Sequence, residues 1–220
     1  MDPANLFVTL FMAASMLSTS TQKNTRPCKR TGDGVTVRAQ IFYDLTVNTT
    51  GGSEESMEAI RKPGKADFDK LFKKVQDHFH REFVMVNFTV ESVKERDELV
   101  VQSYFHGYII AIETLQKVIE SEPQPLRNDS ITYFFTSRPL YEGRWRADLP
   151  GDVVDYEATF NTFCNKTRSA AVVNYISMES HEHTVAATAW VFGQKKYKSY
   201  TYRDYKSMNL TFSHCEKTAG

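Results

Sequence analysis

The sequence has few cysteines, no excess of charge of either sign and no apolar run long enough to span a bilayer. Its 3 Cys in 220 residues exclude a disulfide scaffold but allow one bridge with one thiol left over. Lys and Arg number 27, as do Asp and Glu, so no overall field attracts nucleic acid or an anionic membrane. The apolar stretch 6–17 is too short to cross a bilayer. These absences argue against nucleic acid and membranes as partners.

The composition is that of an ordinary folded domain. Hydrophobic residues make up 41% of the chain and charged residues 25%, which is enough apolar material for a core and excludes a disordered chain. No internal repeat or second domain is visible. We therefore expect one domain over residues 35–220.

The first 21 residues have the pattern of a secretory signal peptide. The apolar run 6–17 is followed by small polar residues at 18–21, which suits a cleavage zone. A short buried helix is the alternative, because the start of the chain carries Asp2 and lacks the usual Lys or Arg. Residues 22–34 are polar and basic, with Pro27 and Cys28, and are expected to form an irregular leader.

Five Asn-x-Ser/Thr sequons, well separated along the chain, support secretion and predict a glycoprotein. Asn87 lies in a strand-like run, so a glycan there requires an outward-facing side chain. The acceptors are Asn48, Asn87, Asn128, Asn165 and Asn209.

Hydrophobic periodicity predicts alternating strands and helices. Val35, Val37, Ala39 and Ile41 alternate as in a strand, and Phe68, Phe72, Val75 and Phe79 recur at helical spacing. The predicted strands are 35–45, 83–93, 99–104, 131–135, 156–163 and 169–175; the predicted helices start near Asp67 and cover 109–120 and 183–197; residues 138–155 are a predicted loop. This order predicts an α/β fold with a mixed, mostly parallel sheet flanked by helices.

Residues 160–194 resemble a known family of secreted enzymes. They contain an edge strand, a Cys, an Arg-Ser pair, a β-run ending at Tyr175 and a helix with Thr188-Ala189. This segment, together with the strand and helix order of 35–135 and the terminal Phe212-Ser213-x-Cys215, resembles the reprolysin or adamalysin branch of the metzincin zinc metalloproteases, including secreted forms from tick saliva. The resemblance implies a metzincin-like fold with an active-site helix near 183–197.

That family carries the motif His-Glu-x-x-His-x-x-Gly-x-x-His, in which three His bind zinc and the Glu is the base. Aligned on the helix, the three ligand positions fall on Trp190, Gln194 and Tyr200, the base falls on Val191, and the bending Gly on Tyr197. An indole cannot bind zinc, and Val has no proton to transfer. The resemblance therefore implies a pseudoenzyme without metal or cofactor. The aromatic side chains there either pack the helix or contact a ligand in the inherited cleft.

The resemblance also implies a disulfide between Cys164 and Cys215, which leaves Cys28 free or paired with another chain. It further implies a secreted, extracellular salivary effector that binds host proteins rather than cleaving them. The identity of the partner and the oligomeric state stay open.

Three other interpretations compete with this one. A secreted lipocalin-type carrier of a small ligand would need eight successive antiparallel strands. An active zinc metallopeptidase would need displaced ligands. The cluster His181-Glu182-His183 could hold a metal, although we expect it to be an exposed polar loop before the helix.

Overall fold

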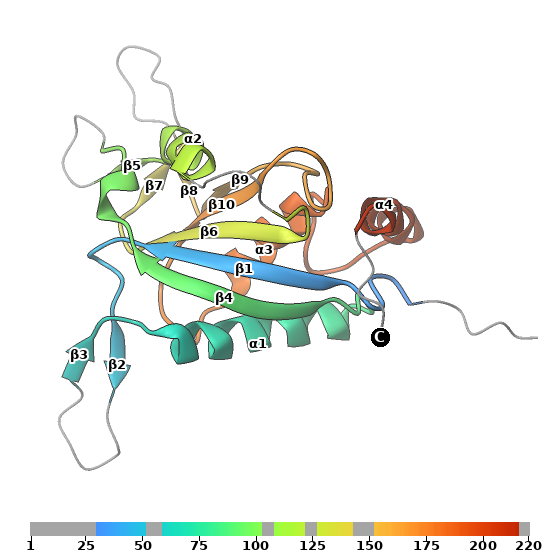
Figure 1. The fold of residues 1–220 in the computed structure, drawn as a ribbon, viewed down its shortest axis with the longest axis horizontal. Helices are drawn as coiled ribbons and strands as arrows, with labels where there is room; N and C mark the ends of the chain where they lie inside the picture. Colours follow the sequence, from blue (N-terminus) through green and yellow to red (C-terminus); the bar gives the residue numbers. More distant parts are fainter. Residues whose placement is uncertain (1–29, 52–58, 103–107, 122–126, 143–151, 216–220) are drawn as a thin grey trace, which may run out of the picture.

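The computed structural model describes residues 30–51, 59–102, 108–121, 127–142 and 152–215. A five-stranded sheet in the order β4-β1-β6-β10-β9 forms its centre (Figure 1). The strands of this sheet are β1 Thr36–Tyr43, β4 Asn87–Glu95, β6 Ser130–Thr136, β9 Tyr156–Ala158 and β10 Ser169–Asn174.

Strand direction confirms the predicted fold class. The pairs β1–β4, β1–β6 and β6–β10 are parallel, and only the edge strand β9 runs antiparallel, against β10. A lipocalin barrel is antiparallel throughout, so the lipocalin interpretation is wrong as regards the fold. The protein is a mixed α/β structure with a mostly parallel sheet flanked by helices.

Helices cover both faces of the sheet. Helices α1 (Lys65–Arg81) and α3 (Glu182–Val191) share one hydrophobic cluster, and α2 (Ala111–Ser121) belongs to a second cluster on the opposite face (Figure 1). Helix α4 (Tyr202–Ser213) adds Met208 and Phe212 to the first cluster. The sheet is thus buried on both faces, as parallel sheets require.

Local sequence explains these elements. Phe68, Phe72, Val75 and Phe79 are all buried on one face of α1, as their spacing predicts. Every residue of β6 is buried, which fits its central position in the sheet. Strand β1 alternates as predicted, and Phe42 on its other face joins the cluster of α2.

Some short elements differ from the predictions. In place of a strand at 99–104, a 3₁₀ turn covers Asp97–Leu99 and an isolated bridge joins Gln102 to Ile109; residues 103–107 lie outside the described part. Two small sheets also form. They contain β2 Thr49–Gly51 with β3 Ala59–Arg61, and β5 Ile109–Ile110 with β7 Leu140–Tyr141 and β8 Val153–Val154.

Three elements in the second half of the chain, α3, α4 and β9, differ from the predictions. Helix α3 ends at Val191 rather than near residue 197, and the following segment is irregular. Helix α4 was not predicted, although Thr201 and Asp204 form a capping box at its start. Strand β9 is also shorter than the predicted 156–163.

The end of the expected leader is packed rather than irregular. Thr31 is buried and pairs with Val84 in a parallel bridge, and its carbonyl accepts the amide of Met85 at 2.7 Å. The folded part therefore starts before residue 35. The expected signal peptide, 1–21, and Cys28 lie outside the described residues.

Within the described ranges, no helix is both long and apolar enough to cross a membrane.

Candidate functional site

Helix α3 is the element on which the zinc motif was aligned, and its middle is packed against the sheet. Thr184, Thr188 and the small residues around them are buried, and Thr188 Oγ1 lies 2.8 Å from the phenol oxygen of Tyr133 on β6. Burial raises the pKa of the Tyr133 phenol far above its ordinary range. The Tyr133 phenol therefore stays uncharged, and the middle of α3 packs against the sheet through neutral side chains.

Aromatic side chains surround the C-terminal end of α3. Trp190 is half-buried, and its ring packs edge-on against Phe160 with centroids 4.9 Å apart. Phe192 is fully buried, with ring centroids 5.5 Å from Phe79 and 5.0 Å from Phe212. Val191 is also fully buried. For these residues the packing interpretation is supported.

The loop before Cys164 closes the end of this helix. The amide of Asn161 donates to the Trp190 carbonyl at 3.2 Å, and the amide of Thr162 donates to the Val191 carbonyl at 3.1 Å. Asn161 has φ of 56° and accepts a hydrogen bond from Thr211 Oγ1 of α4 at 3.2 Å. Asn tolerates this left-handed conformation better than most residues, so Asn161 was a local signal against a strand as long as the predicted 156–163.

Chain geometry separates the proposed ligand positions. Gly193 has φ of 84°, so the helix stops before Gln194, and Trp190 and Gln194 are not one helical turn apart. Gln194 is buried, and its side-chain nitrogen Nε2 has no hydrogen-bond partner among the described residues. The Tyr200 hydroxyl is likewise buried without a partner, and burial raises the pKa of its phenol.

This donor set does not fit zinc. Trp190 offers an indole, Val191 an alkyl group and Gln194 a neutral amide, whereas zinc sites use Cys, His and carboxylate ligands. Among the described residues, no group of three His, Cys, Asp or Glu side chains is placed to hold a metal. The aligned positions therefore provide no ligand set for a catalytic zinc at this helix.

The His181-Glu182-His183 cluster starts α3 instead of preceding it as an exposed loop. His181 is the N-cap, and His183 bonds through Nδ1 to the carbonyl oxygen of Asn174 at 3.0 Å. The other ring nitrogen of His183 lies 3.5 Å from Asp155. Both His side chains are half-buried, and His183 is already engaged on both sides of its ring.

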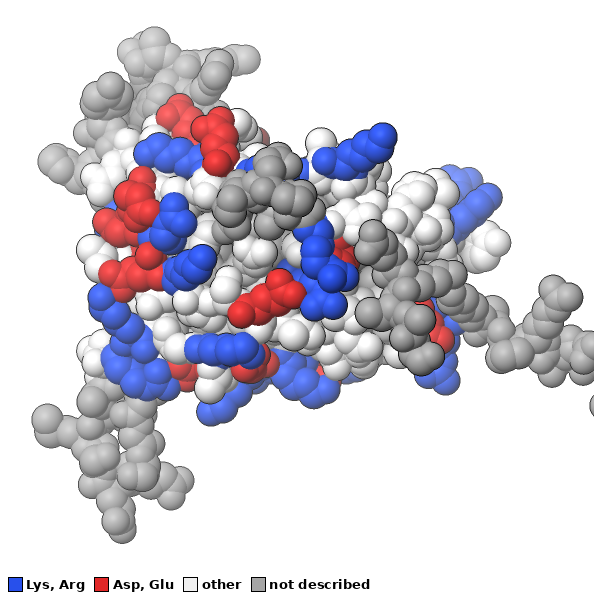
Figure 2. All heavy atoms as spheres, in the orientation of Figure 1, with Lys and Arg blue, Asp and Glu red and all other residues white. Residues whose placement is uncertain are grey.

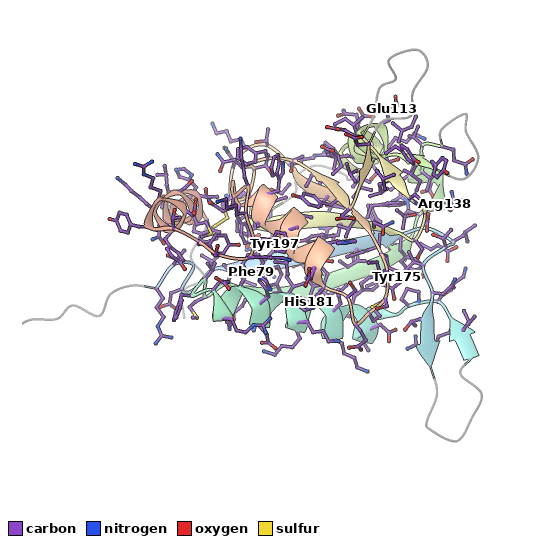
Figure 3. All side chains as sticks on the ribbon, turned by 180° about the vertical axis from the view of Figure 1, so that it is seen from behind. Phe79, Glu113, Arg138, Tyr175, His181 and Tyr197 are labelled. Carbon is purple, nitrogen blue, oxygen red and sulfur yellow. A yellow bond between two sulfur atoms is a disulfide. The ribbon has the colours of Figure 1, made fainter. Side chains whose placement is uncertain are left out.

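A contact that the sequence analysis did not predict joins α1 to the segment after α3. His78 Nε2 lies 2.8 Å from the carbonyl oxygen of Tyr197, and the His78 ring centroid is 6.0 Å from that of His181. Figure 3 shows Phe79, His181 and Tyr197 gathered between α1 and α3. No sequence signal indicates this contact, because 119 positions separate His78 from Tyr197.

The predicted disulfide is present. Cys164 and Cys215 are joined over a sequence separation of 51, and both are buried. The bridge ties the loop that closes α3 to the end of α4.

The sequon side chains differ in exposure. Asn87 is exposed on β4, as its use as an acceptor requires, and Asn128 is half-buried. The exposed acceptors are Asn48, Asn87, Asn165 and Asn209.

The sequence matches no protein-family model and no curated protein. Its fold is similar to the archaemetzincin of Methanopyrus kandleri, with 12% identity, a TM-score of 0.45, and coverage of 80% of this chain and 96% of that one. It is also similar to metalloproteinase-II of Bacteroides fragilis, with 11% identity, a TM-score of 0.46 and coverage of 84% of this chain; the chain spans 55% of that protein. What the site can do follows from the residues of this chain.

Proposed function

We propose that this chain is a secreted, glycosylated protein that acts by binding a protein partner and has no peptidase activity. One observation carries the proposal: helix α3 has apolar and hydroxyl side chains where a zinc peptidase needs imidazole and carboxylate. Its buried residues, from Thr184 to Val191, are Thr, Val and Ala.

The proposal holds for either alignment of the motif. With the first His on Trp190, the ligand and base positions hold Trp, Val, Gln and Tyr. The positive φ of Gly193 favours another alignment, with the bending glycine of the motif on Gly193. The two helical ligands and the base then fall on Ala186, Trp190 and Ala187, and the third ligand falls on Lys196. Neither alignment supplies three zinc ligands or a general base.

Secretion is supported by three independent features. Residues 1–21 have a signal-peptide pattern, Cys164 and Cys215 form a disulfide, and four of the sequon asparagines are exposed. The salivary origin and a host protein as partner rest on the family resemblance alone.

The test is to secrete the full chain from insect cells and measure its zinc content and its cleavage of casein. We expect no stoichiometric zinc and only background cleavage, with or without added zinc and with or without a chelator. An active metzincin, prepared and assayed in parallel, shows that the assay detects cleavage.

Matched variants separate the remaining alternative, an active peptidase with displaced ligands. His181→Ala and His183→Ala remove the two imidazoles at the start of α3 and should leave the background cleavage of casein unchanged. Chelator-sensitive cleavage that either variant abolishes would show that the helix start binds a catalytic metal, and the proposal would be wrong.

A further inference from the structure

A basic cavity lies at the end of the central sheet where β6 and β10 begin. Its volume is about 550 Å³. The walls come from the segment before β6, the loop between Cys164 and β10, and the end of α4. The polar and basic lining residues used below are Arg127, Asn128, Lys166, Arg168, Ser169 and His214.

The charge of this lining is one-sided. Three Lys or Arg residues and one His line the cavity, and none of its described lining residues is Asp or Glu. The whole chain, in contrast, has equal numbers of basic and acidic residues. On the face shown in Figure 2, acidic and basic side chains are interspersed on the left, and more of the charged side chains on the right are basic. Arg127 is paired with Asp129, which does not line the cavity, so the field that attracts anions into this concave site comes chiefly from Lys166 and Arg168.

Two of the cations are held in place by the fold. Arg127 donates through Nε and Nη2 to the carboxylate of Asp129, at 3.0 and 3.2 Å. Arg168 donates through Nη1 to the carbonyl of Ile119 at the end of α2. A ligand would therefore meet guanidinium groups that are already oriented, so less side-chain entropy is lost on binding.

The other groups are suited to complete an anion site. Lys166 is exposed on the loop, lines the cavity and has no carboxylate partner among the residues described. Ser169, only 6% exposed, also lines the cavity, and its hydroxyl has no hydrogen-bond partner within the part of the chain that the structure describes. A buried hydroxyl without a partner costs free energy, which a bound acceptor would recover.

We propose that this cavity binds a sulfate or phosphate ester carried on a sugar. Arg and Lys recognise tetrahedral oxyanions through charge-assisted hydrogen bonds, and the Ser169 hydroxyl and the Asn128 amide add neutral donors. The volume of about 550 Å³ lies in the range of small-molecule sites and exceeds what a bare ion fills, so part of the sugar enters as well.

The acceptors of two sequons, Asn128 and Asn165, line the same cavity. A glycan on either one would compete with an external ligand for this space. The binding test therefore uses the secreted Asn128→Gln/Asn165→Gln protein, in which the amide groups remain and no glycan is attached there.

Binding is measured by calorimetry with three probes: a heparin-derived tetrasaccharide, glucose 6-phosphate and unmodified glucose. The proposal expects saturable binding of at least one charged probe and none of glucose. Lys166→Gln should weaken that binding by about tenfold, the loss of one charge-assisted hydrogen bond, and adding His214→Gln should weaken it further.

Lys196→Gln is the matched control, because Lys196 is also exposed but does not line the cavity. It should leave the dissociation constant unchanged, and circular dichroism should show all variants folded. Preference for the tetrasaccharide identifies a sulfated polysaccharide as the source, and preference for glucose 6-phosphate identifies a phosphorylated sugar. Failure of both charged probes to bind, or equal weakening by Lys166→Gln and Lys196→Gln, would overturn the proposal.

Discussion

The hydroxyls of Tyr133 and Thr188 form a fully buried hydrogen bond of 2.8 Å between the central strand β6 and helix α3. Thr188 Oγ1 also lies 2.7 Å from the carbonyl of Thr184 and donates its proton there. Tyr133 is therefore the donor and Thr188 the acceptor in their shared bond. This ordered chain fixes α3 on the sheet through hydroxyl groups.

Thr188→Val should destabilise the protein by about 1–3 kcal/mol, because it leaves the buried Tyr133 hydroxyl without an acceptor. Tyr133→Phe should cost less, since Thr188 keeps its bond to Thr184. Urea denaturation of both variants measures the free energies of unfolding. The double variant Tyr133→Phe/Thr188→Val should be no less stable than Thr188→Val alone, and strictly additive losses would contradict the shared bond.

Gly193→Ala should destabilise the end of α3. Gly193 has φ of 84°, and an added Cβ would lie 2.6 Å from Asn161 Oδ1. Gly34→Ala is the matched control, because Gly34 has φ of 78° with nothing within 4 Å of the added atom. The free energy of unfolding of the control should fall only by the cost of the backbone strain, about 1–2 kcal/mol. If thermal denaturation shows a larger loss of stability for Gly193→Ala than for Gly34→Ala, the difference comes from the close contact with Asn161. Equal losses would show that this contact costs no stability.

Removing the disulfide should cost a large part of the stability. The closed loop spans 51 positions, and the chain-entropy relation gives about 4 kcal/mol for a loop of this length. The comparison is between wild type and Cys164→Ser/Cys215→Ser in urea. Peptide mapping without reduction should recover the two cysteines in one linked pair; a pair that contains Cys28 would contradict the structure.

Asp67 should give the protein an acid-sensitive contribution to stability. The Arg61 guanidinium, bonded to Asp67 at 2.7 and 2.8 Å, and the Gly64 amide hold the pKa of this carboxyl below its ordinary value. Because the pKa is lower in the folded state, the contribution is present above the unfolded pKa of about 4 and is lost as the pH falls through the folded pKa.

Asp67→Asn should therefore lower the free energy of unfolding at pH 7 by about 1 kcal/mol and flatten its decrease below about pH 4. Urea denaturation across this range measures both effects. Asp69→Asn is the control, because Asp69 is exposed and pairs, among the described residues, with Lys65 on the same helix. If Asp69→Asn flattens the pH dependence as much as Asp67→Asn, the Asp67 pair is not its cause.

The sequence was sufficient for elements that have a strong local pattern. The apolar spacing from Phe68 to Phe79 predicted α1, and the apolar run 131–135, bounded by Asn128-Asp129 and by Pro139, predicted β6. Such patterns are reliable because a core face imposes its period directly on the sequence. Helix α4 was missed, although the spacing of Thr201 and Asp204 is a capping-box signal that could have located its start.

The end of α3 could not be found from the sequence in the same way. Residues 190–197 keep an aromatic and Lys-rich pattern that suits a helix, and a glycine inside such a pattern is tolerated. In the folded chain, the amides of Asn161 and Thr162 bond to the last carbonyls of the helix and Gly193 turns the chain away. These partners lie about 30 positions earlier in the sequence, beyond any local pattern.

The sequence by itself determined the α/β class, the main strands and helices and, through family resemblance, the Cys164–Cys215 pair. Only the tertiary structure decided where α3 ends and that Lys166 and His214 line one cavity with Arg127. The hydrophobic periodicity of a helix or strand is a pattern among residues that are close in the sequence. A cavity and its charge, in contrast, depend on residues that the sheet register brings together from distant segments.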